Sequence, residues 1–147
     1  MESTRVLIVA HRTAATPALI EEVRDRASRG DCVFTLLVPN PAHGLHRLVD
    51  PEDIGEGEAR DTLELALPLL SEAAGGEVQG LVGCAEPLAA IQDAVNLRGF
   101  DEIIISTLPK RISRWARRDL PHKAAGLGLP VTTVTAKGVE RLGAQAR

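Results

Sequence analysis

The sequence has almost no aromatic side chains: it lacks tyrosine, and phenylalanine and tryptophan together make up 2% of its 147 residues. Proteins that hold single-stranded nucleic acid stack its bases on aromatic rings, so this class is not expected. The two cysteines, Cys32 and Cys84, are far apart and have no metal-ligand spacing, which argues against a disulfide framework or a zinc site. Long hydrophobic runs are also missing, because Val6–Ala10 is too short for a signal peptide core or a membrane span. A cytoplasmic protein is expected.

What the chain does have is the composition of a soluble globular domain. Hydrophobic residues make up 44% and charged residues 25%, and the length suits a single domain over 1–147. The formal net charge is −3, yet residues 110–118 hold five of the 17 lysines and arginines. These five cations are Lys110, Arg111, Arg114, Arg117 and Arg118. The chain is acidic overall and strongly basic in this one segment.

Short apolar segments rich in β-branched residues recur along the chain and predict five strands. They are Arg5–Ala10, Val33–Val38, Val78–Val82, Glu102–Ser106 and Val131–Thr135. The first, second and fourth are nearly continuous in hydrophobicity, which is typical of strands buried on both faces of a parallel sheet. Helical patterns separate the strands, so the sequence predicts an α/β fold.

Four helices are expected between these strands. The first is expected to begin at Pro17, a proline at the first helical position that follows the capping residue Thr16, and to end at Gly30. The others are expected over about Glu58–Ala74, Pro87–Leu97 and Leu120–Ala125. The long connection before the second of these helices contains His43 and His46. A metal site there is one interpretation, but a solvated loop is favoured because the spacing matches no metal-binding signature.

Three stretches give the chain a resemblance to a known family. With "VLIVAHRTAATPALIEEV" near the start, "PLAAIQDAVNLRGFDEIIIST" later and "LPVTTVTA" near the end, it resembles the universal stress proteins over nearly its whole length. The resemblance implies a Rossmann-like, three-layer α/β/α sandwich with a five-stranded parallel sheet in the order 3-2-1-4-5. It also implies a homodimer formed through the last strand. In that arrangement the residues after the first and fourth strands face each other where the strand order reverses.

The resemblance also locates a nucleotide site, and this sequence departs from its pattern. ATP-binding members hold the adenine end with an aspartate after the first strand, where this chain has His11. Their phosphate motif, G-x2-G-x9-G-[ST], aligns with Ser106, Pro109, Asp119 and Leu120. Pro109 has no N–H to offer an anion, and Asp119 brings negative charge to the place where phosphates would lie. A degenerate site without a bound cofactor is therefore predicted, with ATP as the disfavoured alternative.

The basic segment fills the nine-residue spacer of that motif, and two interpretations remain open. One is that arginine and lysine side chains bind an anion or an acidic protein surface at the strand ends; the other is a solvated surface turn. The candidate anion-binding residues are His11, Arg12, Thr13, Ser106, Thr107, Lys110, Arg111, Arg114 and Arg117. Nucleic acid is a less favoured partner, because the net charge is acidic and no motif of a binding module is present.

The function expected from these observations is that of a regulatory or stress-response binding protein and not of an enzyme. One alternative is an ATP-binding universal stress protein with a non-standard site. A second is a small hydrolase or phosphotransferase that uses His11, with Ser106, Thr107 or His122 nearby, although no catalytic motif supports it. The homodimer is expected through Val131, Thr132, Thr133, Val134 and Thr135. These residues would form an open sheet edge that the polar residues after them are not expected to cover.

Overall fold

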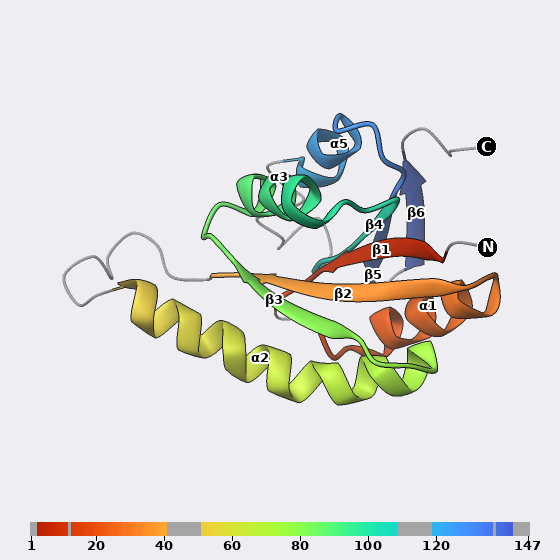
Figure 1. Ribbon diagram of the computed structural model, residues 1–147, viewed down its shortest axis with the longest axis horizontal. Helices are drawn as coiled ribbons and strands as arrows, with labels where there is room; N and C mark the ends of the chain where they lie inside the picture. The colour runs from red at the N-terminus through yellow and green to blue at the C-terminus, as the bar shows by residue number, and fades with distance from the viewer. Residues whose placement is uncertain (1–2, 12, 41–50, 109–118, 137, 143–147) are drawn as a thin grey trace.

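The computed structural model describes residues 3–11, 13–40, 51–108, 119–136 and 138–142, and of 51–56 and 142 only the backbone. Strands and helices alternate along the chain for most of its length (Figure 1). In chain order they are β1 (Thr4–Val9), α1 (Pro17–Ser28), β2 (Cys32–Pro39), α2 (Pro51–Ala74), β3 (Gln79–Gly83), α3 (Pro87–Arg98), β4 (Glu102–Ser106), α5 (Leu120–Ala125), β5 (Val131–Thr135) and β6 (Gly138–Leu142).

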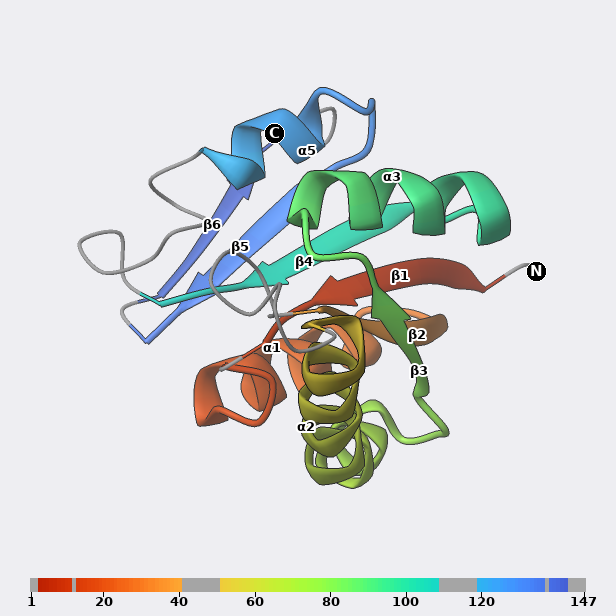
Figure 2. The ribbon, with the colours of Figure 1, turned by 90° about the vertical axis from the view of Figure 1, so that its left-hand side faces the viewer.

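The sheet has the order β3-β2-β1-β4-β5-β6. Its first five strands are parallel, which confirms the predicted order 3-2-1-4-5. Helices α1 and α2 cover one face of the sheet and α3 and α5 the other (Figures 1 and 2). The predicted three-layer α/β/α sandwich is therefore the observed architecture. Among the described residues, no helix has the length and apolar character needed to cross a membrane.

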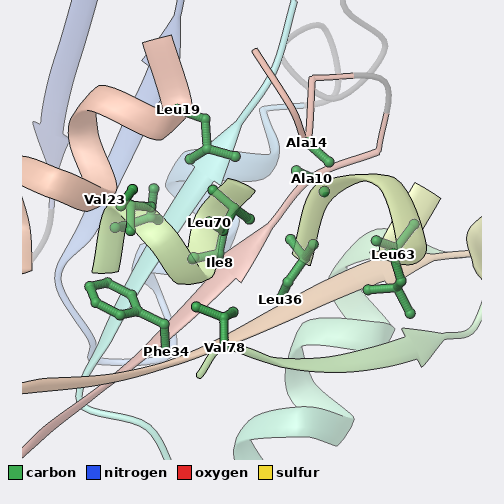
Figure 3. Close-up of a cluster of buried hydrophobic side chains, with 14 of the residues drawn as sticks. Ile8, Ala10, Ala14, Leu19, Val23, Phe34, Leu36, Leu63, Leu70 and Val78 are labelled. Carbon is green, nitrogen blue, oxygen red and sulfur yellow. The ribbon is translucent and has the colours of Figure 1, made fainter. Parts of the chain in front are cut away.

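Each face of the sheet has its own hydrophobic core, and β1 contributes to both. Val6 and Ile8 belong to the core under α1 and α2, whereas Leu7 and Val9 belong to the core under α3 and α5. All four side chains are completely buried. Figure 3 shows the first core, with Leu36 of β2 and Leu70 of α2 among the side chains that pack together. Burial on both faces explains why the central strands are almost continuously hydrophobic.

The prediction that β5 is an open edge is wrong. The chain turns back after Thr135, and β6 pairs antiparallel with β5 in the register Val131↔Leu142 to Thr135↔Gly138. Polarity was a poor guide here, because an edge strand is held mainly by its backbone hydrogen bonds and tolerates charged side chains that face solvent. The backbone of β5 is thus paired on both sides, by β4 and by β6.

Helix starts agree with the capping signals more closely than with the hydrophobic pattern. Glu86 caps α3 by accepting a hydrogen bond from the Ala89 N–H at 2.6 Å, and Pro87 follows it. Helix α2 begins at Pro51, earlier than the expected start near Glu58. The buried positions that reveal its period begin only at Ala59, and the residues before it are rich in acids, so the sequence showed no apolar face there.

At the amino ends of the parallel strands, a partly buried ion pair joins a helix to the sheet. Arg26, near the end of α1, donates from Nε and Nη2 to the two carboxylate oxygens of Glu102 at 3.0 and 2.6 Å. These hydrogen bonds hold the pKa of Arg26 above its ordinary value. Because Glu102 is the first residue of β4, the pair joins α1 to β4 at the amino end of the strand. The carboxyl end, where the candidate site lies, is built differently.

Candidate functional site

Strands β1 and β4 lie side by side at the centre of the sheet. After β1 the chain enters α1 on one face, whereas α5, the next described helix after β4, lies on the other face (Figure 2). This is the reversal point at which open parallel sheets bind ligands, outside the carboxyl ends of the strands. The predicted residues after β1 and after β4 therefore do meet at one place.

A pair of buried hydroxyl groups joins the two sides of this reversal point. Thr13 Oγ1 and Ser106 Oγ are 2.6 Å apart, with 7% and 2% of the two residues exposed. Ser106 Oγ also lies 3.4 Å from the carbonyl oxygen of Thr13, which accepts a hydrogen bond from Thr16 Oγ1 at 3.0 Å. We call Thr13, Thr16 and Ser106 the hydroxyl cluster. Its members bind one another and hold the segment after β1 against the end of β4.

Thr16 and Thr107 each donate a hydrogen bond to a backbone carbonyl, but in different segments. Thr16 precedes α1 as expected for a cap, but its side chain makes no capping hydrogen bond to the helix, because it bonds the Thr13 carbonyl instead. Thr107 is 6% exposed, and its N–H donates to the carbonyl oxygen of Val134 at 3.0 Å. Its backbone therefore extends the pairing between β4 and β5 by one residue. Of the candidate residues, Thr13, Ser106 and Thr107 are buried parts of the framework.

His11 lies at the rim of the site, beside helix α2. Its side chain is 19% exposed, and Nε2 is 4.0 Å from Oε1 of Glu58, whose side chain is 60% exposed. That separation is too long for a hydrogen bond, so the contact is electrostatic and requires a protonated imidazole. The Glu58 carboxylate thus places negative charge beside His11, where it disfavours an incoming anion. Glu58 was not expected beside His11, because α2 was predicted to begin near this residue, whereas it begins at Pro51.

Asp119 has a backbone conformation that usually belongs to glycine. With φ 58° and ψ 40°, it is the only non-glycine residue of the described segments that has a positive φ. Its carboxylate Oδ1 lies 2.5 Å from Nδ1 of His122, and both side chains are more than half exposed. The left-handed backbone fits the position at which the family resemblance places a glycine. The side chain adds a carboxylate, paired with a histidine, that a glycine would not bring.

Leu120, at the position where the resemblance places a serine or threonine, is part of the hydrophobic core. It is 4% exposed and packs in the core under α3 and α5, which also contains Ala124. A hydroxyl group that reaches an anion must face the strand ends, whereas this side chain faces inward. The residue therefore stabilises α5 against the sheet.

Several predicted residues fall outside the described part of the chain. These are Arg12, Lys110, Arg111, Arg114 and Arg117, together with Arg118, Pro109, His43 and His46. Within the described segments, no group of three or more histidine, cysteine or acidic side chains is arranged to hold a metal ion. The basic segment and the His43–His46 pair thus remain predictions from sequence.

Comparison with known proteins gives no match by sequence and a consistent match by structure. No family model matches the chain, and no curated protein matches it. UspA from Lactobacillus plantarum aligns over 91% of this chain and 99% of its own, with 18% identity and a TM-score of 0.65. The universal stress protein from Archaeoglobus fulgidus in complex with dAMP aligns over 90% of this chain and 98% of its own, with 21% identity and a TM-score of 0.62. The chain has the universal stress protein fold.

A more distant match shows the same fold in a plant protein. A universal stress protein family protein from Arabidopsis thaliana, crystallised with AMP bound, aligns over 90% of this chain and 91% of its own. Its identity is 14% and its TM-score 0.61. At such identities the universal stress protein fold is what these proteins share with this chain, and the chemistry of the site must be argued from the residues found here.

Proposed function

We propose that this chain is a divergent universal stress protein that acts as a cytoplasmic regulatory or stress-response binding protein through a degenerate nucleotide site. The observation that carries the proposal is Leu120. Where the resemblance places a phosphate-binding hydroxyl, this chain buries an aliphatic side chain in its core. The residue that would end a phosphate-binding loop therefore packs α5 against the sheet instead.

The neighbouring positions support the same proposal. Asp119 brings a carboxylate to a position where an anion would need unobstructed backbone N–H groups. Glu58 adds a second acidic group beside His11. A carboxylate near a phosphate is unfavourable, because like charges repel. Ser106 does not offset this, since its hydroxyl is buried and bonded to Thr13.

The same contacts argue against catalysis. A serine nucleophile needs an exposed hydroxyl and a base within hydrogen-bond reach. Ser106 is 2% exposed, and its hydroxyl lies 2.6 Å from the hydroxyl of Thr13. We therefore retain the interpretation that the chain is not an enzyme. Turnover of phosphate esters by the wild type, lost in His11→Ala, would support the alternative of a His11-dependent hydrolase or phosphotransferase.

Nucleotide binding through a non-standard site is the second candidate function. Universal stress proteins that share this fold have been solved with dAMP, AMP or cAMP bound. Binding here would have to proceed without the glycine-rich cradle, and the basic segment 110–118 offers cationic side chains for it. Side-chain cations at a wet surface are screened by salt, so such binding would be salt-sensitive and would show little preference for adenine.

The test is mass spectrometry of small molecules released from the purified protein. A universal stress protein crystallised with AMP, prepared in the same way, serves as the control. We expect the control to release adenine nucleotide and this chain to release none in stoichiometric amount. One adenine nucleotide per chain, retained through purification in high salt, would overturn the degenerate site and establish the second candidate.

A further inference from the structure

Strand β3 forms the edge of the sheet opposite β6 and lies between α2 and α3 (Figure 2). The two edges differ in charge: β6 carries Glu140 and Arg141, whereas the chain has no charged residue from Val78 to Ala85. Natural edge strands are usually protected by charged residues or proline, which prevent other strands from pairing with them. Strand β3 has neither, so its outer side is suited to accept another strand.

The backbone groups on this outer side belong to Gly80 and Val82. The Asn40 N–H donates to the carbonyl oxygen of Gly83 at 2.9 Å, so the backbone of Gly83 points toward β2. In a parallel ladder the backbone groups of successive residues point alternately to the two sides of the strand. Those of Leu81 therefore point toward β2, and those of Gly80 and Val82 point away from it. Gly80 is exposed and consists of backbone alone, so its backbone reaches solvent.

An exposed apolar side chain lies beside the same edge, on the α3 side. Ala90 of α3 lies against Gly83, where an added Cβ atom would be 2.7 Å from the Ala90 Cβ. Arg98, at the end of the helix, donates from Nη1 to Oε1 of Gln79 at 3.2 Å. Leu97 lies two turns after Ala90 on the same side of α3, and it is 83% exposed, more than any other large hydrophobic residue of the described segments. The uncharged edge and Leu97 together form an apolar surface of the kind found at protein interfaces.

We propose that two copies of this chain pair through β3, antiparallel, about a two-fold axis at Leu81. In this register Gly80 of each copy faces Val82 of the other, and the two residues exchange both of their backbone hydrogen bonds. Pairing is thereby confined to the five residues of β3. It ends before Val78, whose N–H already donates to Ser71 Oγ at 3.0 Å. The interface is not the one through the last strand that the family resemblance implies, and it does not depend on the degenerate nucleotide site.

The side chains and charges fit a second copy in this register. The position of a side chain at Gly80 is occupied on the α2 side, since an added Cβ atom would be 3.0 Å from Leu67 Cδ1. The branched side chain of Val82 from the second copy therefore faces a residue that has none. Because α3 runs antiparallel to β3, the end of α3 in one copy meets the start of α3 in the other. Arg98 thus lies near Glu86 of the second copy, and the first turn of that helix covers Leu97, so opposite charges and apolar surfaces both match.

Disulfide trapping with Leu81→Cys, in a background with Cys32→Ala and Cys84→Ser, tests the register. Each copy of residue 81 faces the other on the two-fold axis as a non-hydrogen-bonded pair, with about 4.5 Å between Cα atoms, which is within disulfide range. We expect oxidation at tens of micromolar protein to give a covalent dimer on non-reducing gels. Val139→Cys in the same background is the control, because Val139 is 43% exposed on the opposite edge. We expect it to crosslink only at the level of random collisions.

Two further variants weaken the interface without a cysteine. Val82→Pro removes the outward N–H from each copy, whereas Val82→Ala shortens the same side chain and keeps that donor. We expect the proline variant to have a dimer dissociation constant about tenfold or more above that of the alanine variant, measured by sedimentation or light scattering. Leu97→Glu should also weaken the dimer, and it should leave the fold intact because this side chain is 83% exposed.

The outcomes distinguish this interface from other ways of associating. Dimers that give no crosslink through Leu81→Cys, and that Leu97→Glu does not weaken, would overturn pairing through β3 and point to another interface. Monomers at tens of micromolar would overturn pairing between copies and leave the edge to an extended segment of another protein. Neither result would change the release of nucleotide from the purified protein, so the proposed function is tested separately.

Discussion

Removing the two hydroxyl groups that join β1 to β4, singly and together, tests how the reversal point is built. Ser106→Ala leaves Thr13 Oγ1 buried without its 2.6 Å partner, and Thr13→Val leaves Ser106 Oγ with only the long 3.4 Å contact to the Thr13 carbonyl oxygen. A buried hydroxyl without a partner costs about 1–3 kcal/mol, whereas removing both partners of a hydrogen bond is close to neutral. We therefore expect each single variant to lose about 1–3 kcal/mol of unfolding free energy. The double variant should lose no more than either single one, which corresponds to a coupling of at least about 1–3 kcal/mol.

Urea unfolding followed by circular dichroism measures all three variants on one scale. Ser28→Ala is the matched control, since its exposed hydroxyl bonds only the local carbonyl of Asp25, and its removal should change stability by less than about 0.5 kcal/mol. Losses that simply add in the double variant would refute the reasoning, because additivity means that the two hydroxyl groups do not depend on each other. A Ser106→Ala variant as stable as the wild type would refute it as well.

Three further predictions concern the core, a buried carboxylate and the left-handed residue. Ile104→Ala should lose about 2–5 kcal/mol of stability, because Ile104 is 2% exposed, and a variant that melts with the wild type would contradict the assignment of β4. Burial raises the pKa of Glu22 above its ordinary 4.5 despite Arg29 and Arg141, so its favourable contribution is fully present below that value and is lost as the pH rises through the raised pKa. The unfolding free energy of the wild type minus that of Glu22→Gln should thus fall as the pH rises above about 4.5, and a rise would show that the arginines outweigh burial. Asp119→Gly should be more stable than Asp119→Ala by about 1 kcal/mol in thermal unfolding, since only glycine adopts φ 58° without strain, and equal stabilities would contradict this.

The fold could be predicted because its determinants are local and repetitive. Val6 to Val9 and Ile103 to Ile105 are hydrophobic at every position, which only a strand covered on both faces can accommodate. Strand order came from the family resemblance and not from periodicity, and the structure confirms it. The sixth strand could not be read in this way, because "GVERL" shows no alternation of apolar and polar residues and Val139 is 43% exposed. Its place is set by antiparallel pairing with β5.

The candidate site could be predicted less completely, because it depends on contacts between distant segments. The sequence placed Thr13 and Ser106 at the same end of the sheet, but not within hydrogen-bond distance of each other. The neighbour of His11, Glu58, depends on a helix start that the hydrophobic pattern does not mark. The pairing of Asp119 with His122 had one usable signal, a spacing of three residues at the start of a helix. The only sequence signal for the inward direction of the Leu120 side chain was its apolar character.

Isothermal titration calorimetry with ATP, inorganic triphosphate and sulfate, each at low and at physiological ionic strength, tests the proposed degenerate site most directly. The comparison variant carries Arg111→Ala, Arg114→Ala and Arg117→Ala, which removes three cations of the basic segment. We expect ATP to bind no better than triphosphate, and any binding to weaken steeply with salt and to disappear in the triple variant. Tight, adenine-selective binding of ATP that is insensitive to salt and survives in the triple variant would contradict the account.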